Sequence, residues 1–322
     1  MRKSAALIVA TVSVAVLAGC SPASPAAGCD PITSAGDAST LIATSGDVGT
    51  SPTVRIPTPI FGTGSETSAT VVGEGRVLQH GDIADVEASL YLGETGELLT
   101  ATEYSADAAG LRLTVGEDDN VMSQVLQCQT VGSRLASILT IADIYGDAPL
   151  DPSLGIDTDD TVVLVSDIRT GYPGKADGAI QSLASGFPAV VTAPDGTPGI
   201  SFPNELPPTE LGITALRVGD GATVQDGDQA VVHYTGVLWD TQEVFDSSWE
   251  RNQPATFVAS AMDESGSGGL VPGFAQALIG ATVGSQILVV IPPEFGYPAG
   301  SAPGSVPEGS TMVFVLDILG IE

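Results

Sequence analysis

The chain has 322 residues, which is enough for about two domains of ordinary size. Its 39 acidic residues outnumber its 10 basic residues and give a formal charge of −29, so repulsion disfavours binding to nucleic acid and charge-driven adsorption to anionic lipid. We therefore expect protein or small-molecule partners and no nucleic acid. The alternative is that the acidic bias serves only the solubility of a secreted protein.

The N-terminus has the pattern of a bacterial lipoprotein signal. Arg2 and Lys3 precede an apolar run over residues 5–18, which is shorter than the roughly 20 residues of a membrane-spanning helix. The run ends in LAGC at 17–20, which resembles a lipobox whose cysteine receives the lipid. We expect a signal peptide over residues 1–19 and a lipid on Cys20 that anchors the protein outside the cytoplasm on the cell membrane. An ordinary signal peptide with a chance cysteine is the alternative.

Two cysteines remain after Cys20, namely Cys29 and Cys128. Because disulfides persist outside the cytoplasm, we predict that these two are bonded to each other, with two free buried thiols as the alternative. The two histidines, His80 and His233, are scattered and do not complete a metal-ligand spacing with the thiols. We expect no metal and no other cofactor.

The composition then divides the chain. Residues 20–50 are rich in small and polar residues and are expected to form a flexible tether. Residues 51–170 predict a first domain, residues 171–186 a linker, and residues 187–322 a second domain. In the first domain, apolar alternation predicts strands over 75–78, 84–92, 111–115, 133–141 and 161–168 and a short helix over 121–127. In the second, it predicts strands over 230–237 and 243–245.

The second half of the chain repeats the first. VGEG at 72–75 followed by Gly81-Asp82 parallels VGDG at 218–221 followed by Gly227-Asp228, at the same spacing. Further matched pairs follow in the same order: Leu126 and Leu278, Val131 and Val283, Tyr145 and Tyr297, and Ile168 and Ile318. Two copies of one fold are therefore predicted.

The second half also contains six motifs in a characteristic order. They are VVHYTG at 231–236, VFDSS at 244–248, RNQP at 251–254, LVPGF at 270–274, IPPEFGY at 291–297 and VFVLDIL at 313–319. In this order they resemble the FKBP family of peptidyl-prolyl cis/trans isomerases, and the resemblance covers about residues 218–322. It implies an α+β fold with two FKBP-like domains, each a curved antiparallel sheet wrapped on a short helix. In the second domain that helix would lie near residues 274–278, with an aromatic pocket beside it.

The resemblance also assigns the residues of that pocket. The catalytic positions are Tyr234, Phe245, Asp246, Tyr297 and Phe314, and the substrate-binding positions are Arg251, Phe257, Leu270, Val271, Phe274 and Val306. The loop over 294–310 would overhang the pocket and bring Ser301, Pro303 and Val306 to the substrate, with an ordinary connection as the alternative.

The sequence departs from the family pattern in both copies. Phe274 stands where the family commonly has tryptophan, and Ala255 stands where phenylalanine is frequent, so we expect a shallower and slightly wider pocket. In the first copy, the positions that match Tyr234, Phe245, Asp246, Phe274 and Phe314 hold Ala88, Leu99, Thr100, Met122 and Leu164. These residues supply neither an aromatic wall nor a carboxylate, and only Tyr145, the match of Tyr297, is retained. We expect this copy to be inactive and to serve a structural or client-binding role.

Prolyl isomerisation needs such a pocket rather than a nucleophile. Rotation about an X–Pro bond breaks amide resonance against a barrier of about 18–20 kcal/mol, and an apolar site that desolvates the polar planar amide favours the twisted transition state. Four phenylalanines would hold the proline ring, while Tyr234 and Asp246 orient the peptide, Arg251 keeps Asp246 ionised and Tyr297 donates to the substrate carbonyl. The plain alternatives are core packing for the rings and a surface salt bridge for Asp246 and Arg251.

His233 lies beside the candidate site, but strand alternation points it to the face opposite Tyr234, so we do not expect it to act in catalysis. The preferred interpretation is a monomeric, lipid-anchored prolyl isomerase that acts on proline-containing exported polypeptides and that binds macrolide inhibitors in the same pocket. The alternative is a non-catalytic extracytoplasmic chaperone or protein-binding module.

Overall fold

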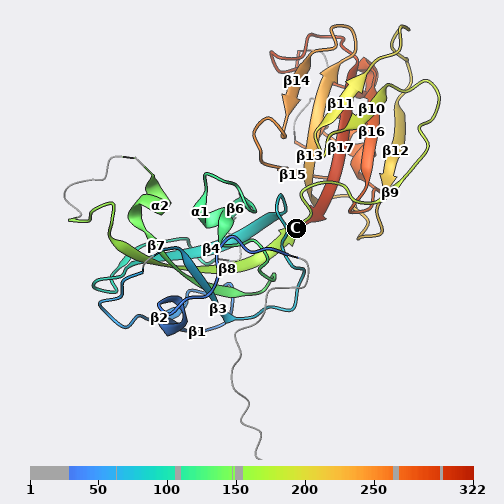
Figure 1. Cartoon of the computed structure of the whole chain (residues 1–322). Helices are drawn as coiled ribbons and strands as arrows, with labels where there is room; N and C mark the ends of the chain where they lie inside the picture. Colours follow the sequence, from blue (N-terminus) through green and yellow to red (C-terminus); the bar gives the residue numbers. More distant parts are fainter. Residues whose placement is uncertain are drawn as a thin grey trace, which may run out of the picture.

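The computed structural model describes residues 29–62, 64–105, 110–146, 148, 155–263, 268–297 and 300–322. Two antiparallel sheets dominate these residues, one in each half of the chain (Figure 1). Helices are few and short, so the described part is sheet-rich. We refer to residues 29–172 as the first domain and to residues 173–322 as the second domain.

The first sheet has the strand order β3-β7-β8-β4-β5, and β6 pairs with the first half of β4. Its strands are β3 (Glu66–Val71), β4 (Ile83–Leu92), β5 (Leu98–Ala101), β6 (Leu111–Thr114), β7 (Arg134–Thr140) and β8 (Thr161–Tyr172). Helices α1 (Val121–Gln124) and α2 (Ile141–Tyr145) lie on one face, and the hairpin of β1 (Ala43–Ser45) and β2 (Thr53–Arg55) lies on the other (Figure 1). Both helices begin at side-chain caps, Asn120 for α1 and Thr140 for α2.

The second sheet has the order β14-β13-β17-β16-β12-β9, and β15 pairs with the first half of β13. Its strands are β9 (Ala179–Ile180), β12 (Gly212–Val218), β13 (Gln229–Leu238), β14 (Val244–Ser247), β15 (Ala255–Val258), β16 (Gln286–Ile291) and β17 (Met312–Ile321). Helix α3 (Pro272–Leu278) packs on β16, and Pro272 suits the first helical turn because its missing N–H would be unpaired there anyway. A separate hairpin joins β10 (Ala189–Thr192) to β11 (Pro198–Ser201).

The two sheets repeat each other down to their irregularities. The order β5-β4-β8-β7-β3 in the first matches β14-β13-β17-β16-β12 in the second. Three breaks in strand register recur at matched positions: Ala69/Val71 and Ala215/Arg217, Asp85/Val86 and Val231/Val232, and Leu90/Tyr91 and Gly236/Val237. Because register breaks bend and twist a sheet locally, both sheets curve at the same points. The predicted internal repeat is therefore present in the backbone.

Both faces of each sheet are buried. In β17 the residues Met312, Phe314, Leu316 and Ile318 enter the inner core with α3, and the alternate residues Val313 and Val315 enter an outer core. Phe187, Val190 and Ile200, in and beside the β10–β11 hairpin, pack on that outer core, and residues 38–60 around the β1–β2 hairpin do the same in the first domain. This double burial explains the runs of consecutive apolar residues in central strands such as β16 and β17.

A buried polar pair ties each outer hairpin to its sheet. In the first domain the Arg134 guanidinium binds Asp167 through two contacts of 2.6 Å, and both side chains are fully buried. Its remaining N–H groups donate to carbonyls in the β1–β2 turn, those of Ser45, Gly46, Asp47 and Thr50. In the second domain the matched pair is Gln286 and Asp317, joined at 2.8 Å.

Several boundaries differ from the sequence-based expectation. The tether predicted over 20–50 is wrong for residues 29–50, because Ile42 and Ala38 are buried there and the β1–β2 hairpin begins at Ala43. The linker predicted over 171–186 is also wrong, because β8 runs to Tyr172 and β9 joins the second sheet. The strand predicted over 75–78 is reduced to one isolated bridge at Val77.

The predicted disulfide is confirmed: Cys29 and Cys128 are bonded, and the bond closes a sequence separation of 99 residues. It joins the start of the described chain to the segment after α1, which is another reason why residues 29–50 do not form a tether. Such a bond is consistent with an extracytoplasmic location. The predicted signal peptide over 1–19 and the lipid on Cys20 lie outside the described residues.

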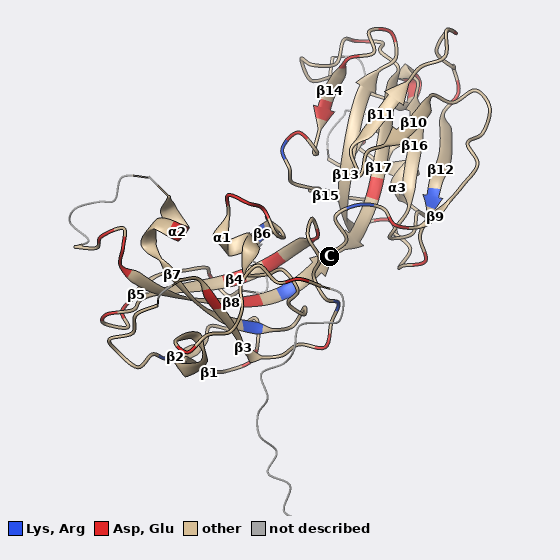
Figure 2. Ribbon diagram, in the orientation of Figure 1, with Lys and Arg blue, Asp and Glu red and all other residues tan. Residues whose placement is uncertain are grey.

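Acidic residues are spread over both domains and recur in the connecting loops, and basic residues are sparse (Figure 2). Among the described residues, no helix is both long enough and apolar enough to cross a membrane.

Candidate functional site

Strand register gathers the predicted aromatic residues on the inner face of the second sheet. Tyr234 in β13 lies across from Leu316, and two residues further along β13 Gly236 lies across from Phe314 in β17. Phe245 comes from β14 and Phe257 from β15, the two short strands that share one edge of β13. Helix α3 contributes Phe274 from the opposite side of the core.

These rings form one cluster with edge-to-face contacts. The Phe274 ring lies 5.0 Å from Phe314 and 5.2 Å from Phe257 between centroids, and Phe245 lies 5.4 Å from Phe314. The interplanar angles of these three pairs are 72–86°, the arrangement that aromatic quadrupoles favour. Phe274 and Phe314 are buried, whereas Phe245 and Phe257 are partly exposed at the rim. The floor of the cluster is therefore buried, and its rim reaches the molecular surface.

Gly236 makes this cluster possible, and the sequence analysis did not single it out. A Cβ atom at this position would lie 2.7 Å from both the Phe245 and the Phe314 rings. Both rings thus pack directly against the β13 backbone. The signal was present in the sequence, because the glycine closes the VVHYTG motif at 231–236.

Polar groups meet at one side of the ring cluster. The Tyr234 hydroxyl donates to Asp246 Oδ2 at 2.5 Å. Arg251 donates from Nη1 to Asp246 Oδ1 at 2.7 Å and from Nη2 to the Tyr234 hydroxyl at 2.9 Å. The three side chains close a triangle, and the guanidinium also lies over the Tyr234 ring at 5.8 Å.

Burial, and after it the hydrogen bond to Asp246, raise the pKa of Tyr234 to about 12. The phenol therefore stays protonated at neutral pH and acts as a donor. Burial also raises the pKa of Tyr297, with a smaller contribution from the charge of Asp246. Tyr297 is thus able to donate a hydrogen bond to a peptide, whereas the single Tyr234 proton is donated to Asp246.

The remaining predicted site residues line the same core. Val271 and Val306 are buried in it, and Leu270 and Tyr297 pack against it while partly exposed. Val306 donates its backbone N–H to the Pro303 carbonyl, so the loop after β16 is tied down by a turn that ends in a buried side chain. Ser301 is partly buried and Pro303 is exposed.

His233 lies on the opposite face of β13, as alternation predicted. Its ring stacks on Trp249 at 4.0 Å, and its Nδ1 lies 2.9 Å from the Ser248 hydroxyl. Burial lowers the pKa of His233 to about 4, so the ring is neutral at physiological pH. The histidine supports the loop that follows β14 rather than the aromatic cluster.

The first domain has aliphatic side chains where the second has rings. Ala88, Leu99, Met122 and Leu164 all belong to its inner core, and Tyr145 is exposed. Leu90 holds the register position of Gly236, across from Leu164. Its buried side chain lies where the second domain leaves room for two rings.

Among the described residues, no group of three or more histidine, cysteine or carboxylate side chains is arranged to hold a metal ion. The cluster presents an aromatic surface bordered by two phenols, one carboxylate and one guanidinium. Such a surface suits an apolar ring joined to a polar amide.

Comparison with known proteins identifies the family. The sequence pattern of the family described as FKBP-type peptidyl-prolyl cis-trans isomerase matches residues 221–319. An FK506-binding protein from Streptomyces anulatus is 34% identical over 125 residues, which cover 38% of this chain and 96% of that protein. A probable FK506-binding protein from Corynebacterium glutamicum is 37% identical over 123 residues, covering 38% of this chain and 96% of that protein.

A third relative is matched over less of its length. The FKBP-type peptidyl-prolyl cis-trans isomerase FkpA from Escherichia coli is 35% identical over 114 residues, 35% of this chain and 38% of that protein. Its crystal structure aligns with a TM-score of 0.31 and 30% identity over 41% of this chain and 51% of that chain. The two bacterial FK506-binding proteins are matched over nearly their whole length, and they bear out the family resemblance of residues 218–322. The chain belongs to the FKBP-type peptidyl-prolyl cis-trans isomerase family and has the isomerase activity of that family.

Proposed function

We propose that the aromatic cluster of the second domain is the isomerase site and that it acts on proline-containing segments of exported polypeptides. The observation that carries this proposal is the triangle of Tyr234, Asp246 and Arg251 at the edge of a cluster of phenylalanine rings. An apolar floor with directed polar groups at one side suits a proline ring joined to a polar amide.

The proposed mechanism is non-covalent. Four phenylalanines hold the proline ring and exclude water from the preceding amide. They are Phe245 and Phe257 at the rim of the cluster and Phe274 and Phe314 at its floor. Water stabilises the planar amide more than the twisted one, so the loss of water lowers the barrier to rotation. Each 1.4 kcal/mol of this difference corresponds to about a tenfold rate increase.

The polar groups orient the substrate. Tyr297 is partly exposed beside the core and carries a protonated phenol, so we assign it the hydrogen bond to the carbonyl before the proline. Tyr234 and Asp246 hold each other and leave the second Asp246 oxygen to Arg251. This arrangement fixes the carboxylate at the edge of the rings. Leu270, Val271 and Val306 form the apolar border towards the loop after β16.

We propose that the first domain is a degenerate copy of the same fold. The matched register breaks support common architecture, and Leu90 together with the other aliphatic side chains supports the loss of a site for proline. The two copies thus divide into one catalytic and one supporting domain.

We further propose that the protein acts as a monomer on the outer side of a bacterial cell membrane, held there by a lipid on Cys20. The lipobox-like sequence at 17–20 supports the anchor, and the Cys29–Cys128 bond supports an oxidising surrounding. Because two relatives are named FK506-binding proteins, we propose that a macrolide of that kind binds the same cluster.

The proposal is tested on the full chain with two assays, isomerisation of a proline tetrapeptide and refolding of a protein whose slow step is prolyl isomerisation. We expect Phe245→Ala to lower kcat/KM at least about tenfold and Tyr234→Phe to lower it several-fold. Phe202→Ala is the matched control, since Phe202 is also partly buried but packs on the outer face against Trp239. It should leave kcat/KM unchanged.

The same assays separate isomerisation from simple binding. A wild-type chain that binds the unfolded client but leaves its slow refolding phase unaccelerated would favour the non-catalytic chaperone. Equal losses in Phe245→Ala and Phe202→Ala would place the activity away from the aromatic cluster.

A further inference from the structure

The two domains share a small apolar core at their junction. Ile83 and Tyr172 of the first domain pack with Val231 and Leu319 of the second, and all four side chains are buried. Gly320 is required there, because a Cβ atom at this position would lie 2.1 Å from the Tyr172 ring. The C-terminal end of β17 consequently lies where the two sheets meet (Figure 1). The junction is therefore packed and is not a simple linker.

Polar contacts extend from this core along β6 of the first domain. Arg112 is held in its own domain by Asp85, with contacts of 2.7 and 2.8 Å from Nε and Nη2. Its guanidinium then reaches the second domain and donates to Thr256 Oγ1 at 2.8 Å and to the Glu322 carboxylate. This arginine therefore joins β6 of the first domain to β15 of the second.

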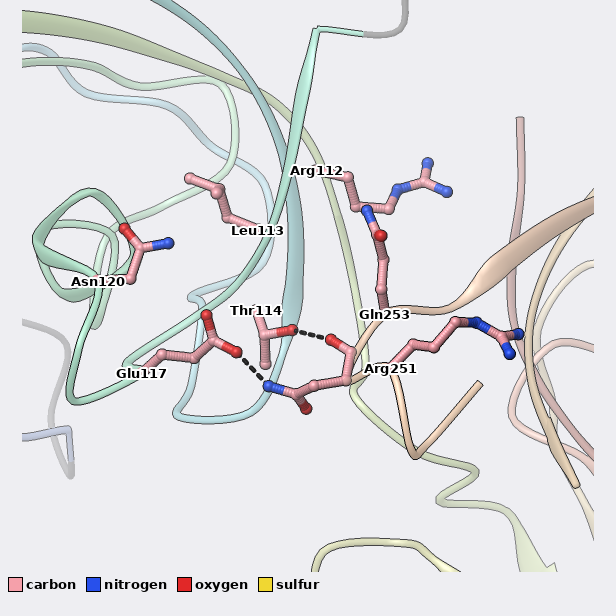
Figure 3. Close-up of a pocket in the computed structure, with 8 residues that line it drawn as sticks. Arg112, Leu113, Thr114, Glu117, Asn120, Arg251 and Gln253 are labelled. Atoms are coloured by element: carbon pink, nitrogen blue, oxygen red, sulfur yellow. Dashed lines mark hydrogen bonds between the residues drawn. The ribbon is translucent and has the colours of Figure 1, made fainter. Parts of the chain in front are cut away.

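The next contact is with the loop that follows β14. Thr114 Oγ1 donates to the Asn252 carbonyl at 3.1 Å, and the Glu117 carboxylate accepts from Asn252 Nδ2 (Figure 3). Asn252 has a φ of 50°, a left-handed conformation that few side chains other than glycine and asparagine adopt easily. The first domain thus binds both the backbone and the side chain of a turn residue in the second.

Asn252 directly follows Arg251, the residue that completes the polar triangle of the site. On the other side of Arg251, Trp249 is fixed by stacking on His233. Arg251 is therefore placed between two anchors, one inside its own domain and one supplied by the first domain. It also lines the cavity between the domains, about 220 Å³, which Glu117 and Thr114 border from the opposite side (Figure 3).

The Arg251 side chain needs this support. It is 52% exposed, and Asp246 is 41% exposed, so their ion pair alone is of the kind that contributes little because two mobile side chains must be ordered. A loop held at both ends places the guanidinium before substrate arrives, which removes part of that ordering cost. The position of Asp246 and of the Tyr234 hydroxyl then depends on contacts made outside the catalytic domain.

We propose that Thr114 and Glu117 of the first domain are positioning residues for the isomerase site, acting through Asn252 and Arg251. The first domain, which lacks the aromatic site, thereby has a defined role in the activity of the second. This inference rests on the proposed location of the site, and its test includes a measurement that does not depend on activity.

The test uses the full chain with Thr114→Val and Glu117→Ala combined. We expect faster hydrogen–deuterium exchange in a peptide that covers residues 248–254, where the Asn252 and Gln253 amides bond within the turn. We also expect kcat/KM for a proline tetrapeptide to fall about three- to tenfold, and this fall to vanish when the same changes are made in an Arg251→Ala background. Thr100→Val combined with Glu94→Ala is the control, because both positions are exposed in the first domain.

The outcomes are distinct. Unchanged exchange in residues 248–254 overturns the positioning role whether or not the chain is active. Equal losses of kcat/KM with and without Arg251 overturn the route through that residue. If the wild-type chain is inactive but residues 248–254 exchange faster in the double variant, the proposed function is contradicted. The contact of the first domain with this loop is then still supported.

Discussion

Gly236 and Leu90 hold the same register position in the two sheets, and the difference between them separates an open aromatic site from a filled aliphatic core. Gly236 faces Phe314 across the β13–β17 ladder, and Leu90 faces Leu164 across the β4–β8 ladder. The glycine lets the rings of Phe245 and Phe314 approach the backbone, whereas the leucine occupies that space with its own side chain.

We predict that Gly236→Ala lowers kcat/KM by at least about tenfold. The added methyl group would meet two rings at 2.7 Å, and both would have to leave the positions in which the proposed mechanism has them hold the proline ring. Gly199→Ala is the matched control, because a Cβ atom there has only the Val191 carbonyl nearby, at 3.6 Å. Isomerase assays and thermal unfolding of both variants check this. Full activity in a folded Gly236→Ala variant would contradict the assigned site.

The buried ion pair of the first domain predicts a large stability effect. Asp167→Ala leaves the Arg134 guanidinium in a fully buried position without its carboxylate, and we expect the free energy of unfolding to fall by about 3–5 kcal/mol. Urea unfolding measures the change. Asp47→Ala is the control, because the Asp47 side chain is exposed and the backbone carbonyl that accepts from Arg134 is kept. It should alter the free energy of unfolding by less than about 0.5 kcal/mol. Similar effects of the two changes would show that the pair does not hold the hairpin.

Reduction of the disulfide should also destabilise the chain. A cross-link that closes 99 residues restricts the unfolded state strongly, and chain-entropy arguments give about 4–5 kcal/mol for a loop of this size. We expect the urea midpoint of the oxidised protein to fall on addition of reductant and the Cys29→Ser, Cys128→Ser double variant to unfold at the reduced midpoint. Two alkylatable thiols in the unreduced, unfolded protein would contradict the bond.

His233 predicts a pH dependence of stability. Burial lowers its pKa to about 4 in the folded state, below the ordinary value of about 6.5, so the unfolded chain takes up this proton first as the pH falls. Stability from His233 is complete above pH 6.5 and is lost between pH 6.5 and 4, at about 1.4 kcal/mol per pH unit.

The measurement compares the wild type with His233→Gln between pH 7.5 and 4. The wild type should be the more stable at pH 7.5, and the difference should shrink as the pH falls. Burial raises the pKa of Asp317 to about 6 and acts in the opposite direction, but this group is present in both proteins and its effect cancels. A difference that stays constant with pH would show that His233 titrates normally in the folded state.

The sequence alone predicted the second domain well because local signals agree there. Alternation located β13 and β14 within a few residues, the family resemblance did so for α3, and the ordered motifs named residues that form one cluster with Tyr234. The pairing of Cys29 with Cys128 followed from the number of cysteines. Each of these inferences depends on residue type and spacing along the chain, which a sequence contains.

Other features depended on where distant segments meet. The composition of residues 29–50 resembles a tether, yet they are ordered, because a completed sheet offers Ile42 an outer core and Arg134 supplies donors to the turn carbonyls. Composition cannot predict this, since the burial of such a segment is provided by the partner and not by its own apolar content. The contact between Thr114 and Asn252 has the same origin. Sequence determined which side chains make up the proposed site, and tertiary packing decided what holds them in place, because packing joins residues whose separation along the chain carries no signal.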